Sequence, residues 1–169
     1  MSGEIDLKRF SASPGIGPRF LSDSANPWYG NWLATAGLYY SQDNLPPKAT
    51  AKIGCAIAAG YNSVYLTFTT PQNFSEMYID YWIKFTGAVA SYNQMVQDSL
   101  GAYSYKALTP AAIWTRNIIK IPDSSATFVS GGNSKDRNSM SKRITVLQFE
   151  GTLAAPWTME IGGLTVRRL

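Results

Sequence analysis

The chain has 169 residues, enough for one domain with its own core, and a formal net charge of +4. It has no histidine and one cysteine, which excludes Ser-His-Asp and Cys-His nucleophiles, histidine-containing zinc sites and internal disulfides. Only 15% of the residues are charged, while ten Tyr, seven Phe and five Trp make the chain rich in aromatic side chains. This composition is typical of an all-β protein.

The first 27 residues differ from the rest of the chain. Residues 11–18 are rich in Gly, Pro and Ser, a composition that disfavours regular secondary structure. Before them, Ile5, Leu7 and Phe10 favour a short strand. Two interpretations stay open: an ordinary first strand with its loop, or an extended arm that lies across a neighbouring subunit. We expect residues 1–27 to be an N-terminal arm and residues 28–169 to form the folded domain.

Short strands are expected over 38–40, 52–59 and 63–69. Their alternation predicts these inward-facing side chains: Ile53, Cys55, Ile57, Ala59, Val64, Leu66 and Phe68. Cys55 is interpreted as a small buried apolar residue, since it lies within an apolar run.

The segment from Glu76 to Phe85 alternates in polarity with a period of two, which predicts a long strand with one face in a core. Its odd positions are all apolar. Its other face carries Tyr78, Asp80, Trp82 and Lys84. Large aromatic side chains on a polar face either pack beneath a neighbouring element or meet a ligand or partner, so this face is a candidate recognition surface.

Further strands are expected over 89–97, 102–108, 113–121 and 143–150, with Tyr103 and Tyr105 on one face and a polar, glycine-rich loop over 130–142. The 143–150 segment is nearly continuously apolar, which indicates a central strand or a bulge. In the last strand, the apolar residues up to Ile161 occupy odd-numbered positions, whereas the apolar residues from Leu164 on occupy even-numbered positions. A bulge at Gly162-Gly163 would keep both sets on the core face.

These nine or ten expected strands, with no sustained helical period, predict two antiparallel sheets in a β-sandwich with under about a tenth of the residues in helix. The predicted core comprises Val64, Leu66, Phe68, Ile79, Tyr81, Ile83, Phe85, Ile119, Ile121, Ile144, Met159, Ile161, Leu164 and Val166.

An ordered set of features runs through residues 60–169: the aromatic strand 81–85, the turn 98–101, Tyr103-Ser104-Tyr105, Trp114 to Pro122, Ile144 to Phe149, and Met159 to Leu164. This order resembles the jelly-roll domains of the galactose-binding and carbohydrate-binding-module type. The resemblance implies an antiparallel jelly-roll β-sandwich that serves as a binding or structural module, often appended to enzymes or built into phage particles. The ligand residues of such domains vary too much for a site to be transferred.

Two functions stay open. The first is a non-enzymatic virion structural protein: a phage capsid decoration (cement) or tail component that contacts the major capsid or tail protein and forms a homo-oligomer. The second is a carbohydrate-binding module, for instance one that binds a host glycan. The candidate binding residues are Tyr78, Asp80, Trp82, Lys84 and Arg116, with Tyr65, Tyr105 and Trp114 as further stacking platforms.

Other functions are not expected. Glu76 and Asp80 are the one acidic pair at i, i+4 spacing on a strand face, and at about 13 Å apart they are too distant for glycosidase chemistry. Carboxylates from two different strands could still meet, but we expect no enzyme. No cofactor or metal is expected. Nucleic-acid binding is not expected either, because the basic residues of 135–143 are interrupted by Asp136, Asn and Ser. Residues 1–10 lack the apolar core of a secretory signal and no run is long enough to span a membrane, so we expect synthesis in a host cytoplasm and a place in the virion.

Overall fold

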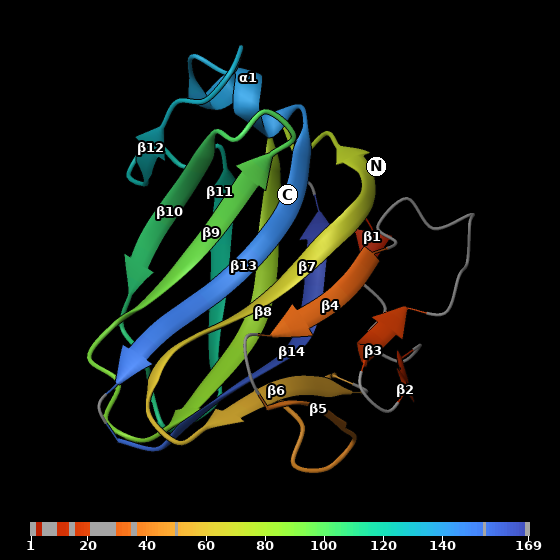
Figure 1. Ribbon diagram of the computed structural model, residues 1–169, viewed down its shortest axis with the longest axis vertical. Helices are drawn as coiled ribbons and strands as arrows, with labels where there is room; N and C mark the ends of the chain where they lie inside the picture. Colours follow the sequence, from red (N-terminus) through yellow and green to blue (C-terminus); the bar gives the residue numbers. More distant parts are fainter. Residues whose placement is uncertain are drawn as a thin grey trace.

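The structure, a computed structural model, describes residues 3–4, 10–13, 16–20, 30–34, 37–49, 51–153 and 155–167. Within this part of the chain, antiparallel strands form two sheets that pack face to face (Figure 1). The predicted all-β, two-sheet sandwich is confirmed.

The two sheets divide the strands as follows. The six-stranded sheet has the order β11 (Thr115–Ile121), β8 (Met77–Thr86), β14 (Trp157–Arg167), β6 (Lys52–Ile57) and β5 (Leu38–Ser41), with β1 (Gly3–Glu4) also paired to β14. The eight-stranded sheet has the order β12 (Thr127–Val129), β10 (Tyr103–Leu108), β9 (Tyr92–Asp98), β13 (Ile144–Leu153), β7 (Gly60–Gln72), β4 (Gly30–Ala34), β3 (Ile16–Phe20) and β2 (Phe10–Ser13). In Figure 1 the strands β10, β9, β13 and β7 lie side by side at the front, with β11, β8 and β14 behind them and β6 and β5 across the bottom.

The core lies between the sheets, and all fourteen side chains predicted for it are buried. The odd positions of β8 point inward as expected, so the parity assignment is confirmed. The phenolic oxygens of the buried Tyr81 and Tyr92 lie 3.2 Å apart, and the Asn117 amide donates to Tyr92 at 3.1 Å. These bonds satisfy polar groups that burial would otherwise leave without partners.

Two strands contain register shifts where the sequence predicts bulges. In β14 the pairing with β8 shifts between Gly162 and Thr165, and both Ile161 and Leu164 are fully buried. In β13 the shift lies between Ile144 and Val146. The predicted bulge at Gly162-Gly163 is therefore confirmed, and it keeps the apolar residues on both sides of it in the core.

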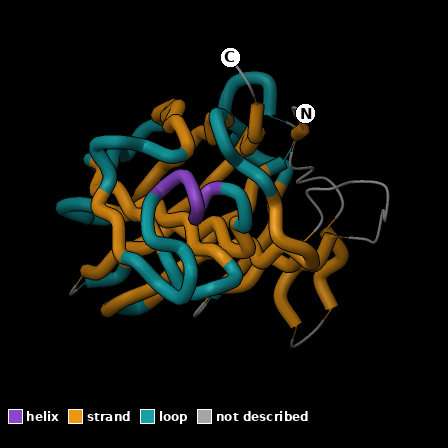
Figure 2. The backbone as a smooth tube through the Cα atoms, turned by 90° about the horizontal axis from the view of Figure 1, so that it is seen from above, coloured by secondary structure: helices purple, strands orange, loops and turns teal. Residues whose placement is uncertain are grey.

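The segment predicted as a loop over 130–142 contains a short helix, α1 (Arg137–Ser141), so that prediction was wrong for these residues. Asp136 begins the helix, because its carboxylate accepts a hydrogen bond from the Ser139 amide at 2.8 Å. Buried Met140 anchors the helix to the core. A helix this short has no detectable period, which is why the polar sequence concealed it. Figures 1 and 2 show α1 at one end of the sandwich, among loops.

Expectations about other strands also need correction; for example, β9 begins at Tyr92 rather than at 89. Strand β6 ends at Ile57, so Ala59 is exposed rather than inward, and the side chain of Ile57 lies outside the described part. Strand β11 begins at Thr115, which leaves Ile113 73% exposed. The short strand β12 was not predicted at all.

The described pieces of the first 27 residues are strands: β1 belongs to the six-stranded sheet, and β2 and β3 end the eight-stranded sheet, so the expectation that 11–18 resists regular structure was wrong for their described residues. Strand β1 pairs with β14, β2 pairs with β3, and β3 pairs with β4 through Arg19 and Asn31. Ile5 and Leu7 lie outside the described residues. The division into an arm and a domain, and a contact of the arm with another subunit, stay predictions.

Candidate functional site

Both sheets have an outer face, and Tyr78, Asp80, Trp82, Lys84 and Arg116 all belong to strands of the six-stranded sheet. The even-numbered side chains of β8 lie on its outer face, as their parity predicts. Arg116 of β11 pairs in register with Trp82, so it adds to the same surface. The structure thus brings together five residues that the sequence separates by almost forty positions.

Three of the five line one groove of about 330 Å³. Its full lining is Pro47, Lys48, Asp80, Trp82, Arg116, Gly163 and Thr165. Tyr78 is half-buried further along β8 and is not among the lining residues. Its role as a binding residue stays a prediction.

The floor of the groove holds an ion pair. The two carboxylate oxygens of Asp80 accept hydrogen bonds from Nε and Nη2 of Arg116 at 2.8 and 2.7 Å. The Asp80 side chain is 8% exposed, whereas that of Arg116 is 46% exposed. Hydrogen bonding to Asp80 raises the pKa of Arg116 above its already high value. The bidentate contact orients the guanidinium, whose other N–H groups remain available at the surface.

Lys84 points into a different environment from the groove. Its ammonium lies 2.8 Å from Glu160 Oε2, while Lys52 lies 2.6 Å from Oε1 and the Tyr39 hydroxyl donates to Oε1 at 3.0 Å. Burial raises the pKa of Glu160, but hydrogen bonds from Lys52, Lys84 and Tyr39 outweigh it, so the pKa lies below its ordinary value. Lys84 therefore takes part in a largely buried charge cluster, and a ligand contact by Lys84 stays a prediction.

Trp114 covers this charge cluster. The ammonium groups of Lys84 and Lys52 lie 5.2 and 6.0 Å from the Trp114 ring centroid, within the range of cation–π attraction. The indole N–H donates to the backbone oxygen of Asn44 at 3.0 Å, which connects the ring to the loop before β6. The Trp114 ring therefore packs against the charged groups of the cluster. Its predicted role as a stacking platform for a sugar is not tested.

The outer face of the eight-stranded sheet carries the other two aromatic candidates. Tyr105 pairs in register with Met95, Met95 with Gln148, and Gln148 with Tyr65. All four side chains are partly exposed. They form one lateral line across four strands, the tyrosine row, whose ends lie about 14 Å apart at the usual strand spacing.

A polar network lies beside the tyrosine row. The carboxylate of Glu150 accepts hydrogen bonds from the Tyr61 hydroxyl at 2.9 Å, the Asn93 amide at 3.0 Å and the Gln148 amide at 2.7 Å. Burial raises the pKa of Tyr61, so its hydroxyl stays protonated as a donor. No cation of the described residues pairs with Glu150. Its remaining lone pairs can accept hydroxyl donors from a ligand.

Sequence reasoning missed Asn93, Met95, Gln148 and Glu150 as members of this surface. The only local signal is their alternation with buried residues along β9 and β13. That alternation assigns each residue to a face but not to a neighbour across the sheet.

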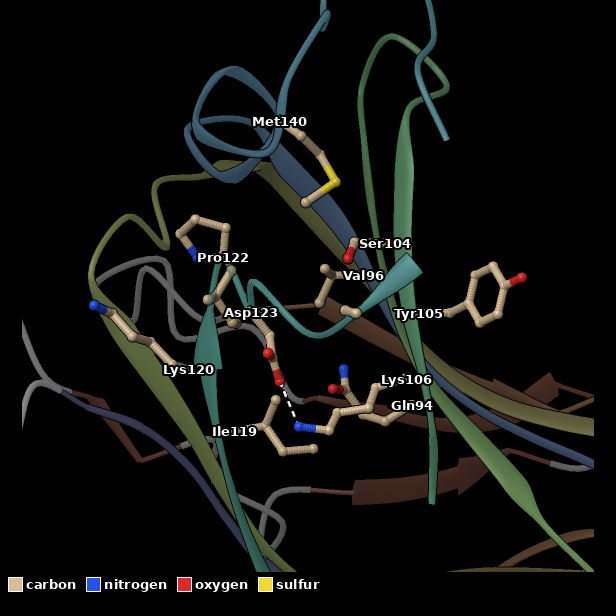
Figure 3. Close-up of a pocket in the computed structure, with 12 residues that line it drawn as sticks. Gln94, Val96, Ser104, Tyr105, Lys106, Ile119, Lys120, Pro122, Asp123 and Met140 are labelled. Carbon is tan, nitrogen blue, oxygen red and sulfur yellow. Dashed lines mark hydrogen bonds and ion pairs between the residues drawn. The ribbon is translucent and has the colours of Figure 1, made fainter. Parts of the chain in front are cut away.

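Two further hollows lie outside these two surfaces. Figure 3 shows a crevice at the edge of the sandwich, where the Lys106 ammonium and Asp123 carboxylate lie 2.7 Å apart and the Tyr105 ring points away. Its volume of about 10 Å³ holds one water at most. A depression of about 490 Å³ lies beside α1, where Arg137 lies over the Phe128 ring at 5.9 Å.

Two classes of feature are absent from the described part of the chain. No group of three or more acidic, cysteine or histidine residues there is placed to hold a metal ion. No helix there is long and apolar enough to cross a membrane.

No protein-family profile and no curated protein sequence matches the chain. Solved structures do. The family 11 carbohydrate-binding module of Clostridium thermocellum, in complex with a β-1,3-1,4-mixed-linked tetrasaccharide, has a TM-score of 0.58 and 14% identity over 94% of this chain and 98% of its own. The family 30 module of a cellulosomal cellulase from the same organism has a TM-score of 0.57 and 13% identity, and the match covers 99% of this chain and 90% of that module.

An agarase also matches, with a TM-score of 0.52 and 10% identity, over 78% of this chain and 22% of the agarase. The similarity here is to a small part of a larger enzyme. At these identities the comparisons show the fold alone: the chain has the jelly-roll sandwich fold of carbohydrate-binding modules.

Proposed function

We propose that this protein is a non-catalytic carbohydrate-binding module that holds a glycan along the tyrosine row of the eight-stranded sheet. The observation that carries this proposal is the row itself, in which Tyr105 and Tyr65 end a line of partly exposed side chains on an open sheet face. Aromatic rings at both ends give apolar surfaces for sugar rings, and Met95 between them is apolar and adaptable.

The polar network supplies the directional contacts that sugar hydroxyls need. Glu150 is held in place by three donors, so a ligand meets an acceptor whose position is already fixed. Gln148 belongs both to the row and to the network. A flat row about 14 Å long suits several consecutive rings of a linear glycan better than one small molecule.

The fold supports the same proposal. Related folds at low identity include a module with a bound β-linked tetrasaccharide and another in complex with β-1,4-galactotriose. These ligands belong to those proteins. They define the class of polysaccharide with which the search for a ligand should begin: β-linked glucans and galactans.

A virion role stays a prediction from the sequence. None of the structures compared above is described as a virion protein, and no contact within the described residues favours a capsid or tail partner. Binding of a host glycan would be compatible both with a virion structural protein and with a carbohydrate-binding module.

The test is affinity electrophoresis of the protein in gels that contain mixed-linkage β-glucan, β-1,4-galactan, xylan or agarose. We expect retardation by at least one polymer. Tyr65→Ala and Tyr105→Ala should each weaken binding about tenfold or more, as loss of an aromatic anchor does. Tyr78→Ala changes a half-buried tyrosine on the other sheet and tests the competing prediction that the outer face of the six-stranded sheet binds the glycan; if the tyrosine row is the site, this variant should bind normally.

Two outcomes would contradict the proposal. If no polymer retards the wild-type protein, the module function fails. If Tyr78→Ala loses binding while a variant that carries both Tyr65→Ala and Tyr105→Ala retains it, the tyrosine row is not the site.

A further inference from the structure

The groove on the six-stranded sheet differs from the tyrosine row in shape and charge, and the proposed function does not use it. Its volume of about 330 Å³ lies at the small end of the range for small-molecule sites. The row is open and long, whereas the groove accommodates a single ring.

The groove exists because of the bulge in β14. Gly163 has a φ of +57°, and a Cβ at this position would lie 3.2 Å from Cδ1 of Trp82. A Cβ on Gly162 would lie 2.8 Å from Pro46. The two glycines therefore let the indole and the loop before β6 approach the β14 backbone closely. Trp82 becomes an aromatic wall of the groove.

The charges that line the groove do not balance. Asp80 and Arg116 neutralise one another, and Lys48 is an additional exposed cation. No carboxylate among the described residues forms an ion pair with Lys48. Arg116 is oriented by Asp80, so its outward N–H groups and the Lys48 ammonium both offer donors at the same opening.

We propose that this groove is a second binding site, separate from the tyrosine row, that takes one sugar ring carrying an anionic group. The ring would stack on Trp82, and its carboxylate or sulfate would lie between Lys48 and the outward side of Arg116. The Thr165 hydroxyl, which donates to the backbone oxygen of Asp80 at 3.4 Å, also lines the groove and can accept a hydrogen bond from a ring hydroxyl. A neutral ring offers Lys48 and Arg116 no opposite charge, so the site favours acidic over neutral sugars.

The test is NMR titration of the ¹⁵N-labelled full chain with three probes: galacturonate, galactose 6-sulfate and galactose. We expect shifts of the Trp82 indole and Arg116 side-chain signals with the acidic probes, and weaker binding as salt rises. The two acidic probes reveal whether a carboxylate or a sulfate fits better. Lys48→Asn should weaken galacturonate binding about fivefold, the effect of one partly exposed ion pair.

Three controls show whether a loss of galacturonate binding in Lys48→Asn comes from the missing charge in the groove. They exclude a loss of folding, a general effect of net charge, and a contribution of the tyrosine row. Lys48 has a φ of +63°, a conformation that Asn adopts readily, so Lys48→Asn should leave the melting temperature unchanged. Lys142→Asn removes an exposed positive charge elsewhere and should not affect galacturonate binding. Tyr65→Ala should leave galacturonate binding intact even if it abolishes binding to polysaccharide.

Three results would overturn the proposal: equal affinity for galactose and galacturonate, normal galacturonate affinity in Lys48→Asn, or shifts confined to the eight-stranded sheet. A Trp82→Leu variant that folds normally, as shown by circular dichroism, and still binds galacturonate with unchanged affinity would also overturn it.

Discussion

The outer faces of the two sheets differ in how they accommodate a carboxylate group. On the six-stranded sheet, Glu160 is nearly buried, carries two lysine partners and lies beneath Trp114. On the eight-stranded sheet, Glu150 stays partly exposed, and its donors among the described residues are all neutral. Removing water from a charge requires compensation by opposite charge, whereas an exposed acceptor does not. The first face is therefore built for stability over much of its area, and the second is free for a ligand.

Neutralising each carboxylate should give the largest contrast between the faces. Glu160→Gln leaves the buried Lys52 ammonium without its anion and should cost about 3 kcal/mol of unfolding free energy. Glu150→Gln should cost about 1 kcal/mol or less, since its site is partly solvated. Urea unfolding of both variants gives the comparison. Equal losses would show that the two faces are energetically alike.

The close approach of Tyr39 to β6 is the next feature to test. A Cβ at Gly54 would lie 2.5 Å from Cζ of Tyr39, so Gly54→Ala should displace the phenol from Glu160 and cost about 2 kcal/mol. Tyr39→Phe, which removes only the hydrogen bond, is the control and should cost about 1 kcal/mol. If Gly54→Ala costs no more than Tyr39→Phe in thermal or urea unfolding, Tyr39 is not packed as described.

The pH dependence of stability should reflect the same cluster. The pKa of Glu160 is lower in the folded protein than its ordinary value of 4.5. Its stabilising contribution is therefore complete above that ordinary value and is lost as the pH falls through the folded-state pKa. Unfolding free energies measured between about pH 3 and pH 6 should fall less steeply in Glu160→Gln than in wild type. Identical slopes would contradict a lowered Glu160 pKa.

The smallest effect on stability is expected on the open face. Tyr65→Ala and Tyr105→Ala should each lower the unfolding free energy by about 1 kcal/mol or less, because both side chains are partly solvated. Differential scanning calorimetry of the variants used for glycan binding measures this. A loss of several kcal/mol would mean that the tyrosines support the fold, and their binding defects could no longer be read as ligand contacts.

The sequence by itself determined which face of each major strand is buried. Alternation in β8 assigned Ile79, Tyr81 and Ile83 to the core, and the change of parity after Ile161 located the bulge in β14. These features are local, because side chains on a strand alternate with a period of two whatever lies beside it. Capping of α1 by Asp136 is also local, but five residues are too few for a period to appear.

Only the tertiary structure decided which outward-facing residues become neighbours. Asp80 meets Arg116 through the register of β8 with β11, and Tyr105 lines up with Tyr65 through three successive strand pairings. The same outward parity left Trp82 in a groove and Lys84 beneath Trp114. Strand alternation fixes the face of a side chain, whereas strand order, register and the loops above the sheet fix its partners, and these depend on contacts between segments far apart in the chain.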